Sequence, residues 1–472
     1  ATRRLTTGSR PAHYRLTTDP DGNDHPGKRT VGEPVPARGH PFGILLATSR
    51  APRRSNGHML TAKLLRVLPL AAALTVAGCS SSPSSSSSSR PPATSTTTSS
   101  GTSTTTAAVA PPTAASTTTT VTAGGPLPAG FKATDLTWIS DGEGWALGDA
   151  PCSTPPCTSV VHTRDGGRTW AGSPAPKADT GSDCAAPSAC VSGIRFADAK
   201  NGYAFGLSSV WFTSDGGQVW SVRSNDSTDA LEIVRGTVMR VTHPAGCPPG
   251  CSYRVQTAAV GSTSWQTSPT PALTGDAAEL ALEGTNRYVA ALGHTAGGAQ
   301  DAHSRFVRST DSGAHWSSFA DPCGTTPSGN EADASAISAG SGGFLAVGCT
   351  ARQAGEAGFV VVSADAGATF GPHRGGLLSA VPSDGEQVEA ISAATGQRLA
   401  VVVIGGGSRS IAVTNDAGAD WAVTHAEAVS NGPTPTPYLG FQDATTGRAV
   451  LNPRSILTTT DGGGHWAPFS FP

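Results

Sequence analysis

Nine cysteines are the residues of this 472-residue chain whose spacing suggests chemistry most directly. Eight of them lie beyond residue 150, at Cys152, Cys157, Cys184, Cys190, Cys247, Cys251, Cys323 and Cys349. An even number of cysteines in an exported chain favours disulfides, although eight cysteines allow many connectivities. Close spacing favours Cys152–Cys157, Cys184–Cys190 and Cys247–Cys251, which leaves Cys323 for Cys349. A metal site is the rival interpretation, but these segments lack the paired Cys-x-x-Cys or Cys/His arrangements typical of zinc. We therefore predict four disulfides and no bound metal.

Acidic side chains in predicted loops are a second set that could do chemistry. They are Asp179, Asp183, Asp301, Asp321, Glu331, Asp333, Asp384 and Glu386. A glycosidase needs two carboxylates roughly 5 to 9.5 Å apart across a cleft. Acidic residues in polar loops are more often simply solvated, so we predict no catalytic residue and keep paired-carboxylate catalysis as the alternative.

Two further groups have simpler interpretations. His294 and His303 flank Asp301 in one predicted loop, where they could bind a metal or carry protons. An irregular loop sets no ligand geometry, so we interpret both as surface histidines. Gly405–Gly407 lacks the following helix and lysine of a phosphate-binding loop, and we interpret it as a turn.

An eight-residue box, Ser/Thr-x-Asp-x-Gly-x-x-aromatic, organises most of the chain. It occurs at Thr163–Trp170, Thr213–Trp220, Ser309–Trp316, Ser363–Phe370, Thr414–Trp421 and Thr459–Trp466. The closing aromatics recur at roughly fifty-residue steps, which is typical of a repeat architecture. One step has double length, and Trp265 lies near its middle. There Val260 replaces the Asp and Ser262 the Gly, so we predict a seventh, degenerate copy.

Each copy follows three short apolar runs, such as Leu136–Trp138, Trp145–Gly148 and Ser159–Thr163. Short β-branched and aromatic runs separated by Gly and Asp turns predict strands joined as hairpins. Each repeat is therefore expected to form a four-stranded antiparallel sheet, with the box as the turn between its third and fourth strands. The box Asp can accept turn amides, the Gly permits a conformation closed to other residues, and the aromatic ring is buried between sheets. We predict a structural role for Asp165, Asp215, Asp311, Asp365, Asp416 and Asp461.

Seven such sheets bury both apolar faces when they pack radially. We therefore predict an all-β fold, a single seven-bladed β-propeller over residues 130–472. The boxes resemble the Asp-box (BNR) repeats of sialidases, sortilin-type receptors, xyloglucan-cleaving glycosidases and photosystem II assembly factors, within the WD40/YVTN/BNR-like superfamily. Phe196–Asp198, Gly202–Gly206 and Thr213–Trp220 most resemble bacterial lipoprotein relatives of the photosystem II assembly factors. That resemblance implies a client-holding role without implying photosynthesis. The Phe-Arg-Ile-Pro signature of sialidases is missing, and xyloglucan-cleaving relatives use two propellers where this chain has one.

The N-terminal part has a different character. Residues 1–58 show no periodic apolar pattern, and we interpret them as a disordered extension that is non-native or mis-assigned, with translation starting at Met59. Residues 59–78 combine a basic start, a short apolar run and small residues, as secretory signals do. Val76–Cys79 resembles the bacterial lipobox, which implies lipidation of the Cys79 thiol; the alternative is an ordinary signal with a chance cysteine. Residues 79–129 are rich in Ser, Thr and Pro and are predicted to form a disordered tether.

A net charge of −2 with 14% charged residues implies no strong polyanion or polycation partner, and no clustered basic face for nucleic acid. All eight cysteines map to the face opposite the boxes, together with the longest predicted loops. Those loops are Ala171–Ser192, His294–Ser304, Ser317–Asp333, Gly371–Gln387 and Ala422–Tyr438. Long loops on a rigid scaffold often bind ligands, although the bridges could serve stability alone.

These features together predict a monomeric, extracytoplasmic binding lipoprotein without a cofactor. It would be held at the bacterial cell membrane through Cys79 and would dock a protein or a cell-envelope glycan on its loop face. The alternative is a glycan-cleaving hydrolase that uses loop carboxylates. Ring closure stays open at this stage: either the last strand or a strand borrowed from near Phe131 must seal the circle.

Overall fold

The computed structural model describes residues 124–180, 189–244, 247, 250–293, 303–326, 328–353, 355–371, 387–429 and 436–472. Within these ranges the chain is almost entirely β-structure, and a short 3-10 turn, η2 (Ser341–Gly343), is the one helical element. No helix in these ranges has the length and apolar character needed to span a bilayer. The predicted extension, signal segment, Cys79 and most of the tether lie outside the described residues.

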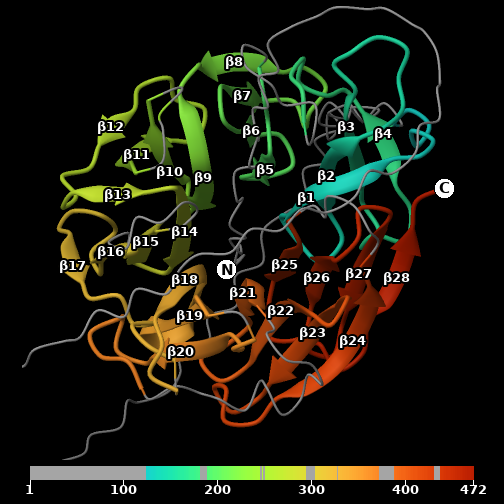
Figure 1. Cartoon of the computed structure of the whole chain (residues 1–472). Helices are drawn as coiled ribbons and strands as arrows, with labels where there is room; N and C mark the ends of the chain where they lie inside the picture. Colours follow the sequence, from blue (N-terminus) through green and yellow to red (C-terminus); the bar gives the residue numbers. More distant parts are fainter. Residues whose placement is uncertain are drawn as a thin grey trace, which may run out of the picture. The chain divides into compact units, whose positions relative to one another are not determined.

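Seven antiparallel sheets follow one another along the chain, and we number them blades 1 to 7 (Figure 1). Blades 1 and 2 contain β1 (Lys132–Trp138), β2 (Gly144–Asp149), β3 (Thr158–Thr163), β4 (Ala171–Ser173), β5 (Gly193–Phe196), β6 (Gly202–Phe205), β7 (Val210–Thr213) and β8 (Ser221–Ser224). Blades 3 and 4 contain β9 (Ser227–Val234), β10 (Thr237–His243), β11 (Cys251–Ala259), β12 (Gln266–Thr267), β13 (Leu273–Gly275), β14 (Ala277–Glu283), β15 (Asn286–Leu292), β16 (Arg305–Ser309) and β17 (Ser317–Phe319). Blades 5 to 7 contain β18 (Ala332–Gly340), β19 (Phe344–Ala351), β20 (Phe359–Ser363), β21 (Gln387–Ala393), β22 (Leu399–Gly405), β23 (Ser408–Thr414), β24 (Ala422–Ala428), β25 (Tyr438–Phe441), β26 (Gly447–Val450), β27 (Ser455–Thr459) and β28 (Ala467–Ser470).

The predicted seven-bladed propeller of antiparallel four-stranded blades is confirmed. In blade 5 the described part of the sheet has three strands, and residues 372–386 that follow are not described. In blade 3 two short strands, β12 and β13, pair in turn with the long strand β11.

The first strand of every blade lies next to the axis. β1, β5, β9, β14, β18, β21 and β25 each contact the first strand of the next blade, and β25 contacts β1. Their sequences fit this position, since β18 is buried over its whole length, whereas an outer strand such as β24 has only exposed and half-buried residues. Burial on both faces explains why the inner strands have long apolar or small-residue runs instead of a strict alternation.

Aromatic rings fill the space between blades. Trp145 on β2 stacks on Phe196 of the next blade with ring centroids 3.8 Å apart. In blades 1, 2 and 7 the box tryptophan packs edge-on against the last residue of the first strand in its own blade, as Trp170 does on Trp138 at 5.8 Å. These three blades therefore place one ring from the first strand and one from the box in the same layer of the core.

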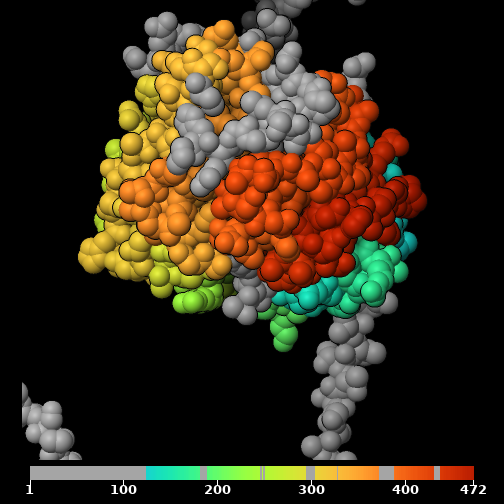
Figure 2. Space-filling model, turned by 90° about the horizontal axis from the view of Figure 1, so that it is seen from below, coloured from blue at the N-terminus to red at the C-terminus, as the bar shows by residue number. Residues whose placement is uncertain are grey.

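The ring closes without exchange of a strand between the two ends of the chain. Blade 1 uses four consecutive strands and so does blade 7. Figure 2 shows the red C-terminal residues beside the teal residues of the first blade. The contact is made by the Gly130 amide, which donates to the Pro472 carbonyl at 2.8 Å, and by the Phe131 and Phe471 rings at 4.8 Å. The strand predicted near Phe131 thus belongs to blade 1 itself.

One group of predicted loops was too long. The fourth strand of a blade begins directly after its box aromatic, so β4, β17 and β24 occupy the first residues of the predicted loops Ala171–Ser192, Ser317–Asp333 and Ala422–Tyr438. The reason is that these strands carry mostly small or polar residues at the exposed edge of the sheet, and such residues give no strand signal in the sequence.

Candidate functional site

The six boxes share one hydrogen-bonded turn. In the first, the Thr163 hydroxyl donates to Asp165 Oδ1 at 2.8 Å and accepts the Gly167 amide at 3.0 Å. The Thr169 amide donates to the same Asp165 oxygen at 2.9 Å. The other five boxes repeat these three bonds. The Ser or Thr that opens the box therefore links its Asp and its Gly.

Hydrogen bonds also keep the box carboxylates ionised. Burial by itself would raise the pKa of Asp165, but hydrogen bonds from Thr169 and Thr163 outweigh burial and lower this pKa to about 2. In four other boxes a bond from the residue four positions later lowers the Asp pKa below its ordinary range; these are Asp311, Asp365, Asp416 and Asp461. A carboxylate whose ionised form is preferred in this way is a poor proton donor near neutral pH. The geometry fits a turn-holding role.

The degenerate seventh copy is held by its neighbours. With no Asp available, the Gly261 amide donates to the Tyr203 hydroxyl of blade 2 at 2.7 Å. The Arg240 guanidinium lies 4.1 Å above the Trp265 ring, a cation–π contact. The Ser264 amide, which corresponds to the amide that the Asp accepts in the other boxes, donates to the Ser262 hydroxyl at 3.0 Å. Blade 3 therefore keeps its turn through a different set of bonds, one of them to the adjacent blade.

The disulfides lie at the other ends of the strands. In each blade one turn joins the first and second strands and another joins the third and fourth strands. We call the edge of the propeller that carries these turns the box rim. The loop rim is the opposite edge, formed by the connections between second and third strands and between blades. Cys152 bonds to Cys157 between β2 and β3, Cys247 to Cys251 between β10 and β11, and Cys323 before β18 to Cys349 in β19. These are three of the four pairs expected from spacing. Cys184 lies outside the described residues, so its pairing with the buried Cys190 stays a prediction.

Two of the predicted loop carboxylates contact an arginine on the loop rim of blade 5 that the sequence did not single out, and the negative charge of one of them acts on a third. Arg352 holds Asp333 with two bonds of 2.7 Å and contacts Glu331 at 2.5 Å. Asp321 accepts the Cys323 amide at 2.9 Å. Burial raises the pKa of Asp321; the Cys323 amide opposes this, and the negative charge of Asp333 adds to it.

The remaining predicted loop residues are more dispersed. Asp179 lies in a short backbone bridge with Cys190, and His303 is exposed. Gly406 and Gly407 form a two-residue hairpin turn with φ of 56° and 77°, so the predicted turn is confirmed. Asp183, His294, Asp301, Asp384 and Glu386 lie outside the described residues.

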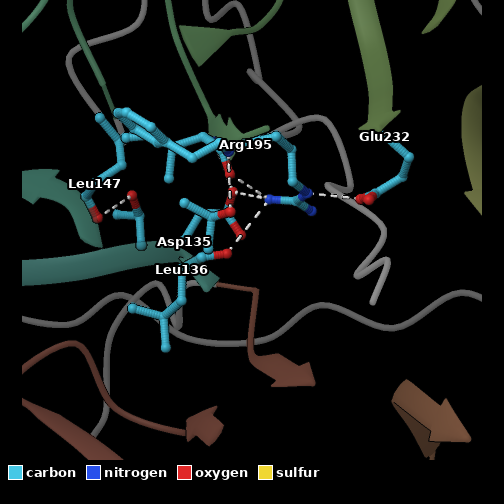
Figure 3. A network of polar contacts seen from close by, with 9 residues as sticks. Asp135, Leu136, Leu147, Arg195 and Glu232 are labelled. Carbon is cyan, nitrogen blue, oxygen red and sulfur yellow. Dashed lines mark hydrogen bonds and ion pairs between the residues drawn. The ribbon is translucent and has the colours of Figure 1, made fainter. Parts of the chain in front are cut away.

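A buried ionic triad crosses the innermost strands of blades 1 to 3, and the sequence analysis missed it (Figure 3). Arg195 on β5 reaches Asp135 on β1 through Nη1 and Glu232 on β9 through Nε, both at 2.6 Å. The three residues are only 4%, 5% and 2% exposed. Burial raises the pKa of Asp135, and the positive charge of Arg195 opposes that rise. Each charge lies on a different repeat, so no local pattern could have revealed the contact.

Polar side chains also join inner strands elsewhere in the ring. The Ile194 amide donates to Asp135 at 2.7 Å and the Ile337 amide to Glu279 at 2.6 Å. At two further junctions the acceptor is a serine: Ala393 donates to Ser338 at 2.9 Å, and Phe441 to Ser392 at 3.2 Å. The centre of the propeller is therefore held by contacts between blades.

Fold and rims together define the class of protein: a single seven-bladed propeller with one repetitive rim and one disulfide-bearing rim. No protein-family model matches the chain, and no curated protein does. Among solved structures it is similar to YCF48 from Cyanidioschyzon merolae, with 14% identity over 71% of this chain and 97% of that one and a TM-score of 0.46. It is also similar to YCF48 bound to D1 peptide, with 16% identity over 72% of this chain and 93% of that one and a TM-score of 0.44. A polysaccharide lyase, an ulvan lyase bound to an oligosaccharide, shows 9% identity over 74% and 96%, with a TM-score of 0.44.

Proposed function

We propose that this chain is an extracytoplasmic binding protein, anchored to the bacterial cell membrane through Cys79, that docks a protein or a cell-envelope glycan on its loop rim. One observation carries the proposal. All three disulfides of the described residues tie connections of the loop rim, and none ties a turn of the box rim.

The two rims differ in what they offer a ligand. Six turns of the box rim repeat one hydrogen-bond pattern, so this rim presents nearly the same surface six times. Connections on the loop rim differ in length, charge and cross-linking from blade to blade. Cross-links reduce the entropy that a loop loses on binding, which favours affinity. Variable, pre-ordered loops on a rigid scaffold are a common basis for recognition.

The binding proposal can be tested by reversing charge on one rim at a time. Lys177 and Arg305 are exposed on the loop rim, and Arg168 and Lys200 are exposed on the box rim. The full chain is captured from envelope extracts and applied to glycan arrays as wild type, as Lys177→Glu/Arg305→Glu, and as the matched control Arg168→Glu/Lys200→Glu. We expect the loop-rim variant to lose binding and the control to keep it. Equal retention by both variants, or loss in the box-rim variant alone, would contradict the proposal.

The anchor is tested separately. Cells expressing the chain from Met59 are fed a fatty-acid analogue that can be detected on protein, and the Cys79→Ser variant is the control. We expect label and membrane association in the wild type only. Label that persists in Cys79→Ser would show that the lipobox interpretation is wrong while leaving the loop-rim proposal intact.

A second candidate function is glycan cleavage, and one observation favours it. Asp321, with a raised pKa, lies in the electrostatic field of Asp333, whose carboxylate is held by Arg352. A carboxyl group whose pKa is raised, beside a second carboxylate held by an arginine, could supply the general acid of a glycosidase. If an envelope glycan is hydrolysed, Asp321→Asn should lower the rate by a hundredfold or more. Unchanged turnover in that variant would remove Asp321 from consideration.

A further inference from the structure

Blade 3 carries a cluster of metal-ligating side chains on its loop rim. His243 is the last residue of β10, Cys251 is the first of β11, and Cys247 lies between them. A nitrogen of His243 and the two sulfur atoms all lie within 4.8 Å of one another. His243 Nδ1 is 3.8 Å from Cys251 Sγ. The two sulfurs are joined as a disulfide in this structure, so the histidine faces an oxidised pair.

A second layer of contacts fixes the imidazole. His243 Nε2 lies 3.1 Å from Oδ1 of Asp229, a buried residue of β9. The Tyr253 hydroxyl hydrogen-bonds to the same carboxylate, and the Tyr253 ring packs edge-on to the imidazole at 5.5 Å. The other nitrogen, Nδ1, lies 2.8 Å from the Pro244 carbonyl and must give up that bond to act as a ligand, while the Asp229 carboxylate holds Nε2. Such a carboxylate is the usual outer layer of a protein metal site.

We propose that His243, Cys247 and Cys251 bind one thiophilic divalent ion of the Zn²⁺ class when the disulfide between the two cysteines is reduced. Two thiolates and one imidazole are the donor set that Zn²⁺ prefers, and a water molecule can complete a tetrahedral shell. The site has two states: a disulfide with a histidine beside it, and a dithiolate with the metal.

The chemistry balances with a dithiol as the reductant. Its thiolate attacks Cys247 Sγ, which is only half-buried, and the buried Cys251 leaves as a thiolate next to His243. The second thiol of the reductant then displaces Cys247, so two electrons and two protons pass to the protein and the reductant becomes a disulfide. Metal binding releases those two protons from the cysteines. His243 Nδ1 must also release the proton that it donates to the Pro244 carbonyl in this structure before it can bind the metal.

The other two disulfides of the described chain are natural controls. Cys152–Cys157 has nearly the same spacing, but it belongs to no group of three potential ligands within the described residues. Cys323 and Cys349 are both 0% exposed, so a reductant cannot reach them in the folded protein. Only the blade 3 pair, among these three, combines an accessible sulfur with a positioned histidine.

The full chain is treated with a dithiol, freed of it, and titrated first with Co²⁺, whose visible absorption reports a tetrahedral sulfur site, and then with Zn²⁺ in competition. We expect one equivalent of metal per reduced chain and none per oxidised chain. Cys247→Ser should abolish binding, and the matched Cys152→Ser/Cys157→Ser chain should keep it. Asp229→Asn should weaken binding by 10- to 100-fold, as expected for an outer-layer carboxylate.

Two results would overturn the proposal. One is a reduced, folded chain that gives no tetrahedral Co²⁺ spectrum, and the other is undiminished binding in Cys247→Ser. Tryptophan fluorescence and thermal unfolding follow the fold throughout. If reduction unfolds the chain, added Zn²⁺ must restore the folded signal in the wild type and not in His243→Ala; failure of that rescue equally rejects the site.

Discussion

The innermost strands of blades 1 to 3 and those of blades 5 and 6 solve the same packing problem with different chemistry. We call the first set the charged arc and the second the hydroxyl arc. Arg195 in β5 and Ser392 in β21 are equivalent positions, because each directly precedes the residue whose amide the previous blade accepts, Phe196 or Ala393. In β5 this position joins two carboxylates, whereas in β21 it accepts one amide, as the Thr137 hydroxyl of β1 also does.

The difference shows which contacts between blades require particular neighbouring blades. A serine that accepts a backbone amide can join any two neighbouring strands, since every strand offers amides. Arg195 requires a carboxylate on each side, and Asp135 and Glu232 supply them from one specific blade before and one after. Burial of three charges costs desolvation energy, and this is recovered only when all three partners are in place. The charged arc therefore depends on the identity of its blades, and the hydroxyl arc does not.

The largest effect expected is that of Arg195→Met. It leaves Asp135 and Glu232 buried without their partner and should lower the free energy of unfolding by about 3–5 kcal/mol. Urea unfolding of the full chain measures this. The triple variant Arg195→Met/Asp135→Leu/Glu232→Leu removes all three charges and should recover most of the loss. A single variant that costs under about 1 kcal/mol would show that the two arcs are energetically alike.

Acid should lower the stability of the blades of both arcs, because each of the two sets of blades has boxes with an ionised Asp. The folded-state pKa of Asp165 is about 2 and that of Asp365 is lowered, whereas an unfolded Asp titrates near 3.9. A lowered pKa contributes stability above the unfolded value and loses it as the pH falls through the folded value. The urea midpoint should therefore fall between about pH 4 and pH 2, and Asp165→Asn should reduce that slope. A midpoint independent of pH over this range would contradict the box pKa directions.

Asp135 of the charged arc should change the pH dependence of stability in the direction opposite to that of the box carboxylates. Burial raises its pKa above that of an unfolded Asp, so the folded chain takes up this proton first and loses no stability through it as the pH falls. Asp135→Asn should consequently make the acid loss steeper, in contrast to Asp165→Asn. Identical slopes in the two variants would remove this distinction between the axis and the box rim.

The hydroxyl arc is tested by Ser392→Ala. The Phe441 amide loses its acceptor in a buried place, so the free energy of unfolding should fall by about 1 kcal/mol, as for one neutral hydrogen bond. Ser392→Thr, which keeps a hydroxyl, is the matched control for loss of the bond. A cost as large as that of Arg195→Met would mean that the arcs differ in chemistry but not in strength.

Sequence patterns were sufficient to predict the features that recur in every repeat. Box spacing predicted seven blades, and the roles of Asp165 and Gly167 follow from turn chemistry within eight residues. Contacts across repeats were beyond the sequence, because Arg195 and Tyr203 look like ordinary strand residues until the ring brings their partners close. Arg352 was missed because its partner Asp333 lies on β18, and the pairing of β18 with the strand before Arg352 cannot be read from the sequence. His243 is the clearest case at the loop rim: the cysteines were recognised, but the hairpin register that places the histidine beside them was not.

The smallest effect is expected for a substitution in the boxes of the blades that form the two arcs. It should raise the free energy of unfolding, whereas the substitutions of Arg195 and Ser392 lower it. In blades 5 and 6 the residue after the box Asp is Ala366 or Ala417, both at φ 58°. In blade 1 the same position is Gly166, at φ 79°. An L-residue in this left-handed region is strained by roughly 1–2 kcal/mol, and a glycine gives back part of that through its freer unfolded chain. Ala417→Gly should therefore raise the free energy of unfolding by less than about 1 kcal/mol. The reverse change, Gly166→Ala, should lower it, because the added Cβ would also lie only 3.1 Å from the Asp141 carbonyl oxygen. Urea unfolding of the two variants side by side decides the matter, and destabilisation by Ala417→Gly would show that the turn tolerates alanine without strain.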